Sequence, residues 1–121
     1  MQLNLDCMRE ILLEVEKLGL NERLPLKKLH EQLNHYSLDE IIYNTAKLNE
    51  ADFIKVVSKK YAANSTIVSI IDITYEGHQF LASIRNKSVW EDIKASALAI
   101  GSFSIPIIQQ IAASYFSSRI I

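Results

Sequence analysis

Two histidines form the ends of the segment His30-Glu31-Gln32-Leu33-Asn34-His35. This segment differs from the zinc-binding pattern His-Glu-x-x-His by one extra residue. That pattern holds a metal because imidazoles four positions apart share one face of a helix. Residues five positions apart are separated by about 140° around the helix axis. We therefore assign this segment to a solvated helix end and expect no metal site.

The other reactive side chains also lack a catalytic arrangement. His78 follows Gly77 on a predicted helix without a partner, which favours a structural or surface histidine. Cys7 is the single cysteine and lies on an apolar helix face, as expected for a small buried side chain. The three glycines are isolated from one another and no Gly-x-Ser-x-Gly occurs, so neither a phosphate loop nor a nucleophile elbow is predicted. We expect neither an enzyme nor a cofactor.

A basic segment offers the first candidate for binding. Residues 53–65 hold three lysines and no acidic residue, which gives a net charge of +3. Lysines contact DNA mainly through its phosphates, which supply much of the affinity. We expect the backbone contacts to come from the lysines and a tyrosine of this segment, namely Lys55, Lys59, Lys60 and Tyr61.

The candidates for reading base edges lie in the preceding segment, residues 38–51. Tyr43, Asn44 and Lys47 have side chains that could reach into a DNA groove. The same segment has one lysine against three acidic residues, so its net charge of −2 repels phosphate. The alternatives are that both segments are simply solvated, or that they meet a protein.

Periodic apolar residues predict three helices before the basic segment. Spacings of three and four residues predict helices over 5–18, with Asp6 near its start, and over a short element from Leu26 to Leu33. A capping box, Ser37-Leu38-Asp39-Glu40, opens the third helix. Its predicted inward face consists of Leu38, Ile41, Ile42, Thr45 and Leu48.

The period then changes to that of strands. Phe53 to Ser58 and Thr66 to Ile73 are rich in Ile, Val and Phe, and the polar connector 59–65 makes the pair a hairpin. Thr74 is a predicted N-cap for the following helix, in which Gly77 marks a close approach of backbone.

Two more helices are predicted near the C-terminus. A second capping box, Ser88-Val89-Trp90-Glu91, opens the first of them, and Gly101 to Ser104 ends it. Its predicted inward residues are Trp90, Ile93, Ala97 and Ile100. Pro106 falls in the first turn of the last helix, where its missing N–H is harmless.

This order of elements predicts a mainly α (α+β) fold: a winged helix-turn-helix with a two-stranded β-hairpin wing, followed by C-terminal helices. The short linker Asn34-His35-Tyr36 suits the turn of that motif. We assign residues 1–86 to the winged helix-turn-helix domain and residues 87–121 to a helical extension.

The segment from Asp72 to Leu81, with its block Thr74-Tyr75-Glu76-Gly77-His78, resembles the hallmark of a domain-of-unknown-function family. Ile84-Arg85, Val89-Trp90, the opening Leu3 to Leu13 and the stretch Tyr36 to Ile41 are similar to it too. The resemblance implies a small winged-helix-like protein of bacteria or their prophages, with no established activity to carry over. Asp52 stands where a small residue or glycine is usual in that family.

Composition sets the remaining bounds. The chain has 121 residues, of which 49% are hydrophobic and 22% charged, with a net charge of −1. A single domain-sized core fits these values, and attachment to nucleic acid or lipid by bulk positive charge does not. One cysteine and the lack of a secretory signal indicate a cytoplasmic protein.

The C-terminal segment 95–118 contains no charged residue. It is long enough to cross a bilayer but only mildly apolar, so a buried or oligomerising helix is favoured over a membrane span. We expect a homodimer through apolar side chains of the last helix, namely Ile105, Ile108, Ile111, Tyr115 and Phe116.

Together these features favour a small DNA-binding regulator that presents two winged-helix units to a two-fold site. The alternative is a winged-helix module that binds a host or phage protein and no DNA, because acid lies on the helix that ought to meet phosphate.

Overall fold

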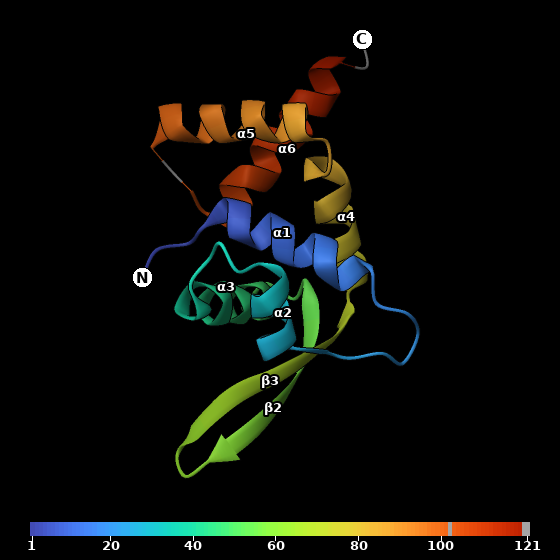
Figure 1. Cartoon of the computed structure of the whole chain (residues 1–121). Coiled ribbons are helices and arrows are strands. Elements are labelled where there is room, and N and C mark those ends of the chain that lie inside the picture. Colours follow the sequence, from blue (N-terminus) through green and yellow to red (C-terminus); the bar gives the residue numbers. More distant parts are fainter. Residues whose placement is uncertain (102, 120–121) are drawn as a thin grey trace. The chain divides into compact units, whose positions relative to one another are not determined.

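The computed structural model describes residues 1–101 and 103–119. Over these residues the chain has six helices and three antiparallel strands, so the fold is α+β (Figure 1). It divides into two compact units, Met1–His78 and Gln79–Ile121. The assignment of separate domains to residues 1–86 and 87–121 stays a prediction.

The first unit begins with helix α1 (Leu5–Glu16), which buries one apolar stripe. Cys7 and Ile11 on this stripe are fully buried. The N-cap is Asn4, whose side-chain oxygen accepts a hydrogen bond from the Cys7 N–H at 3.1 Å. Asp6 lies in the first turn, where its charge favours the helix dipole without capping it.

Helices α2 (Leu26–Gln32) and α3 (Leu38–Glu50) form a pair joined by a short turn. The predicted capping box is confirmed, because Ser37 Oγ accepts from the Glu40 N–H and the Glu40 side chain accepts from the Ser37 N–H. Both α1 and α2 contact α3. Helix α3 is thereby packed against two neighbouring helices.

The inward face of α3 differs from the prediction. Ile41, Thr45 and Leu48 are buried as expected, but Leu38 and Ile42 are 44% and 42% exposed. Asn44 takes the core position instead, with no exposed surface. The helix is therefore rotated from the orientation that hydrophobicity alone predicts, which leaves two large apolar side chains at the surface.

The three strands form a sheet in the order β1-β3-β2. Strand β1 (Leu24–Pro25), which was not predicted, pairs with Ile70 and Ser69 of β3 (Asn64–Ile73). Strands β2 (Ile54–Tyr61) and β3 form a hairpin that projects beyond α2 and α3 in Figure 1. The predicted connector 59–65 is wrong, because only residues 62 and 63 lie between the strands and Ala62 adopts a left-handed φ of 54°.

Helix α4 (Tyr75–Ile84) confirms the two predictions made for its first turn. Thr74 Oγ1 accepts a hydrogen bond from the Gly77 N–H at 3.0 Å and donates one to the Asp52 carbonyl at 2.6 Å. A Cβ at Gly77 would overlap the Phe53 carbonyl oxygen. Asp52 has a left-handed φ of 62°, the conformation that favours glycine at this position.

The second unit contains α5 (Lys87–Ile100) and α6 (Ile105–Arg119), which pack against each other. The predicted capping box at Ser88 is wrong, because the N-cap is Asn86, two residues earlier, whose side chain accepts from the Val89 N–H at 3.1 Å. The prediction that Ile100 points inward is also wrong, since it is 64% exposed. Trp90, Ile93 and Ala97 are buried as predicted.

The end of α5 agrees with the sequence. Gly101 ends it with a left-handed φ of 80°, and Pro106 lies in the first turn of α6. Within the described residues, no helix is both long and apolar enough to cross a membrane.

Candidate functional site

The end of the β2–β3 hairpin carries the basic side chains on which nucleic-acid binding would depend. We call residues 58–66 the wing tip. Lys59 and Lys60 are both exposed there, and their cross-strand partners are Thr66 and Ser65. The sequence has no acidic residue from Phe53 to Ile71, so no carboxylate of the hairpin neutralises these lysines. The side chain of Tyr61 lies outside the described residues.

Lys55 does not join this group. It lies at the base of the hairpin opposite Asp72, four residues from Lys59, which corresponds to about 13 Å along an extended strand. Register shifts on both sides of Val56 and Val57 also interrupt the alternation of the strand. The basic segment of the sequence therefore splits into a wing tip with two lysines and a separate lysine beside an acidic partner.

The outward face of α3 holds the other predicted contacts. Lys47 is half-buried, with its ammonium 2.8 Å from Glu50 and 5.3 Å from the centre of the Tyr43 ring. The hydrogen bond to Glu50 raises the pKa of Lys47. Its charge is thus matched within the helix, while Asp39 remains exposed. This face is acidic and partly apolar.

Asn44, the third predicted base contact, cannot reach a groove because it is buried. Its Oδ1 accepts a hydrogen bond from the Asn4 N–H at 3.0 Å, and its Nδ2 donates to the Glu40 carbonyl at 2.8 Å. Both functional groups of the amide are therefore used inside the fold. We correct the assignment: Asn44 joins α3 to the segment before α1.

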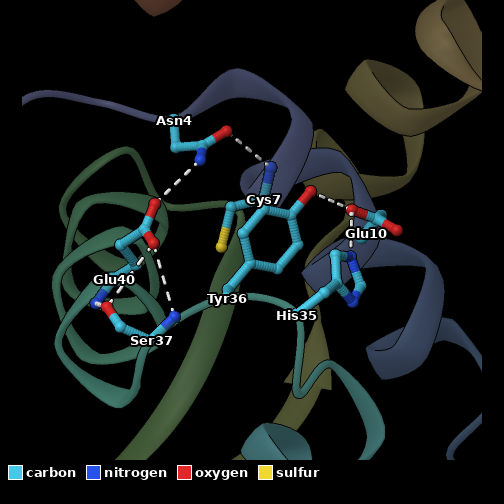
Figure 2. A network of polar contacts seen from close by, with 7 residues as sticks. All are labelled: Asn4, Cys7, Glu10, His35, Tyr36, Ser37 and Glu40. Atoms are coloured by element: carbon cyan, nitrogen blue, oxygen red, sulfur yellow. Dashed lines mark hydrogen bonds and ion pairs between the residues drawn. The ribbon is translucent and has the colours of Figure 1, made fainter.

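A polar network of Asn4, Ser37 and Glu40 extends across the same junction (Figure 2). The Asn4 Nδ2 donates to Glu40 Oε2 at 2.9 Å, while Asn4 Oδ1 caps α1. The other oxygen of Glu40 accepts from the Ser37 N–H at 3.3 Å. One side chain, Glu40, therefore links the N-terminal ends of two helices.

The turn before α3 is attached to α1 by a second cluster. The Tyr36 hydroxyl donates to Glu10 Oε2, and His35 Nε2 lies 3.3 Å from the same oxygen (Figure 2). Burial, followed by the hydrogen bond to Glu10, raises the pKa of Tyr36. Apart from the Ser37–Glu40 capping box, neither the network nor this cluster was predicted, because their members are spread over residues 4 to 44. Together they hold α3 in place relative to α1.

The cysteine and the three histidines are the remaining side chains that could take part in chemistry. Burial, reinforced by the carboxylates of Glu40 and Glu10, raises the pKa of Cys7 to about 12. The thiol therefore stays protonated near neutral pH, where it is a poor nucleophile. His30 is half-buried, whereas His35 and His78 are exposed. Among the described residues, no group of three or more His, Cys, Asp or Glu side chains could hold a metal.

The predicted oligomerisation residues differ in their exposure. Ile108 has no exposed surface, so it belongs to the chain's own core and cannot reach a partner. Ile105, Ile111 and Tyr115 are half-buried, and Phe116 is 38% exposed. The exposed apolar residues that the sequence prediction missed are Leu98, Ile100 and Phe103.

The comparison with known families decides the relationship suggested by the Thr74 to His78 block. Residues 2–104 match the family described as "Hypothetical protein (DUF2513)". The chain belongs to this family. No curated protein and no solved structure matches it. The match covers all elements up to α5 and includes the Thr74 cap and Gly77, whereas α6 lies beyond it.

The buried amide of this DUF2513 member predicts a stability effect. Asn44→Ala removes the side-chain acceptor of the Asn4 N–H and a side-chain donor to the Glu40 carbonyl at a position with no exposed surface, which we expect to cost about 2 kcal/mol of unfolding free energy. Asn49→Ala on the same helix is the control, with an expected change within about 0.5 kcal/mol. Urea unfolding monitored by circular dichroism measures both. Equal stability of the two variants would show that Asn44 is not a structural side chain.

The network also predicts a pH dependence. Hydrogen bonds from Asn4, and then from the Ser37 backbone, lower the pKa of Glu40. A carboxylate with a lowered folded pKa stabilises the native state above its ordinary pKa, about 4.3, and this contribution is lost as the pH falls further. We expect Glu40→Gln to flatten the decline of stability below about pH 5. Urea unfolding at pH 7, 5, 4 and 3.5 measures this decline, with Glu31→Gln at an exposed position of α2 as the control. Identical profiles for both variants would contradict the assignment.

Proposed function

We propose that this DUF2513 member is a winged helix-turn-helix protein that binds DNA through its wing and acts in bacterial or prophage regulation. Support for the fold assignment comes from the order α1-β1-α2-α3-β2-β3 and from the sheet order β1-β3-β2. In this scheme α2 and α3 form the helix-turn-helix and the β2–β3 hairpin is the wing. The fold alone does not decide the ligand, so the proposal depends on the surface.

The observation that carries the proposal is the composition of the wing tip. Lys59 and Lys60 are exposed on a projecting hairpin, surrounded by the exposed hydroxyl and amide side chains of Ser58, Asn64 and Ser65. Ammonium, hydroxyl and amide groups are the side chains that contact phosphate oxygens. A tip without acidic residues presents them to a DNA backbone without repulsion.

The same surface limits the kind of binding. On α3 only Tyr43 and Lys47 remain as groove contacts, and Lys47 is already paired with Glu50. Affinity therefore comes mainly from phosphate contacts, which carry no direct sequence information. We expect weak discrimination between DNA sequences and a strong dependence on salt.

Fluorescence anisotropy of labelled duplex DNA with the full chain tests the proposal. Two phosphate contacts per wing correspond to a slope of about −1.8 for log K against log salt concentration. We expect at least this slope and similar affinities for random and genomic duplexes. Negligible binding at low ionic strength would overturn the proposal.

The second unit supplies the proposed dimer. Leu98 and Phe116 are 67% and 38% exposed in a segment without charged residues, and burying them in a second copy would remove apolar surface from water. We expect Leu98→Glu/Phe116→Glu to turn a dimer into a monomer in sedimentation equilibrium. Gln109→Glu/Gln110→Glu adds the same charges at exposed positions of α6 and should preserve the dimer. A monomeric parent chain, or equal loss in both variants, would contradict this arrangement.

A protein-binding module is the second candidate, favoured by the surface of α3. Leu38 and Ile42, one helical turn apart, are exposed beside the acidic Asp39. Such a surface suits a partner with apolar and basic side chains. Capture from lysate of a protein that binds the parent chain, but not Leu38→Lys/Ile42→Lys, would favour this candidate. Recovery of nucleic acid alone would count against it.

A further inference from the structure

A cleft in the first unit lies beside the base of the hairpin, away from the wing tip. It has a volume of about 600 Å³, within the range of sites that hold small ligands. One wall is the loop 18–23 between α1 and β1, and the other is the base of the hairpin, with Lys55, Ile71 and Asp72. The wing tip is at the opposite end of the same two strands.

The loop wall is built by its own hydrogen bonds. The Glu22 side chain accepts from the Gly19 N–H at 2.8 Å, and the Glu22 N–H donates to the Gly19 carbonyl at 3.1 Å. Asn21 adopts a left-handed φ of 65°, which asparagine tolerates better than most residues. Hydrogen bonds within the loop therefore hold this wall of the cleft.

Charges of both signs line this cleft. Arg23 and Lys55 are exposed, and among the described residues neither forms an ion pair. Asp72 is the cross-strand partner of Lys55, yet its Oδ1 instead accepts from the Ile73 N–H at 2.9 Å. Two cationic groups and two carboxylates, Asp72 and Glu22, therefore line the same space, each carboxylate with one oxygen hydrogen-bonded to a backbone N–H.

Apolar side chains complete the lining. Leu20 is 94% exposed at the rim, and Leu18 and Ile71 are half-buried. Burying such a side chain against an apolar part of a ligand would remove its surface from water. The combination of both charge signs with apolar surface excludes a simple inorganic anion as the best fit.

We propose that this cleft binds a short apolar peptide with free termini. Its carboxylate binds Arg23 and Lys55, its ammonium binds Asp72, and its side chains cover Leu20 and Ile71. Charge-assisted hydrogen bonds at each end fix the length and direction of the ligand. This site is independent of the wing tip, so it does not depend on DNA binding.

The dipeptide Leu-Leu is the probe, titrated into the ¹⁵N-labelled full chain and followed by NMR. We expect saturable shifts of the amides in loop 18–23 and at residues 55, 71 and 72. N-acetyl-Leu-Leu lacks the ammonium and Leu-Leu-amide lacks the carboxylate, so each should bind about tenfold more weakly, the equivalent of one charge-assisted contact.

Variants locate the site. Arg23→Gln/Lys55→Gln should weaken Leu-Leu by tenfold or more while binding Leu-Leu-amide as the parent does. Lys27→Gln/Lys28→Gln, exposed on α2 and outside the cleft, should leave Leu-Leu binding unchanged, as should Lys59→Gln/Lys60→Gln. Absence of saturable shifts with Leu-Leu, or equal binding of all three peptides, would overturn the proposal.

Discussion

Replacing both lysines of the wing tip, in Lys59→Gln/Lys60→Gln, should weaken DNA binding for every duplex sequence and reduce the magnitude of the salt slope by about 1.8. The two side chains are exposed on strand β2, without an acidic neighbour on the hairpin. Each lysine that leaves a phosphate reduces the number of released counterions by about one. Fluorescence anisotropy at four salt concentrations measures the affinity and the slope together.

The matched control removes the same two charges from the same unit. Lys27 and Lys28 are adjacent and exposed on α2, so Lys27→Gln/Lys28→Gln changes the net charge equally. We expect this variant to keep the parental salt slope. An equal loss of slope in both variants would show that DNA responds to overall charge, and the assignment to the wing tip would be wrong.

The largest effect on stability is expected from Gly77→Ala. Alanine normally stabilises a helix interior by about 1 kcal/mol relative to glycine, but here its Cβ would overlap the Phe53 carbonyl oxygen and approach Ile73 Cγ1 to 2.8 Å. The carbonyl is held by the Thr74 N–H at 3.0 Å. Because backbone cannot yield as a side chain can, we expect a loss of about 3 kcal/mol or more.

Gly101→Ala provides the contrast for this prediction. Gly101 has a left-handed φ, but a Cβ there meets no atom within 4 Å. Its substitution should therefore cost only the conformational term, about 1 kcal/mol. Urea unfolding of both variants separates overlap from backbone conformation. A Gly77→Ala protein as stable as the parent would contradict the close approach of α4 to Phe53.

Local signals in the sequence predict the fold well where a few neighbouring residues determine the outcome. The Ser37 capping box, the Thr74 cap and the Gly101 stop each depend on backbone groups within one turn of helix. At Asn86 the same reasoning misses the start of α5, because the adjacent Ser88 and Glu91 imitate a capping box. Both Asn86 and Ser88 have side chains that can accept a hydrogen bond from the first turn of a helix. The packing of the rest of the chain therefore decides which of them is the N-cap.

Non-local pairing accounts for what the sequence does not predict. Strand β1 is two residues long and exists because β3 offers it an edge. Asn44 is polar by type but buried, since Asn4 is brought beside it from 40 residues away. Its place in the core leaves Leu38 and Ile42 outside.

The sequence predicts only part of the candidate site, because it does not show which of the three lysines end up close together. Lys59 and Lys60 are neighbours in the sequence and remain together on one hairpin end. Lys55 belongs to the same basic segment, yet the strand carries it to the other end beside Asp72. Lysines that are adjacent in the sequence stay together at the end of a hairpin. Lysines four residues apart on one strand lie at different ends of it.

Binding of DNA at the wing is the central claim, and its most direct test is an NMR titration of the ¹⁵N-labelled full chain with duplex DNA at low salt. If DNA binds at the wing, we expect the largest amide shifts at residues 58–66 and smaller shifts on α3. Addition of salt should reverse both. The absence of shifts at low salt, or shifts confined to residues 38–50, would contradict it.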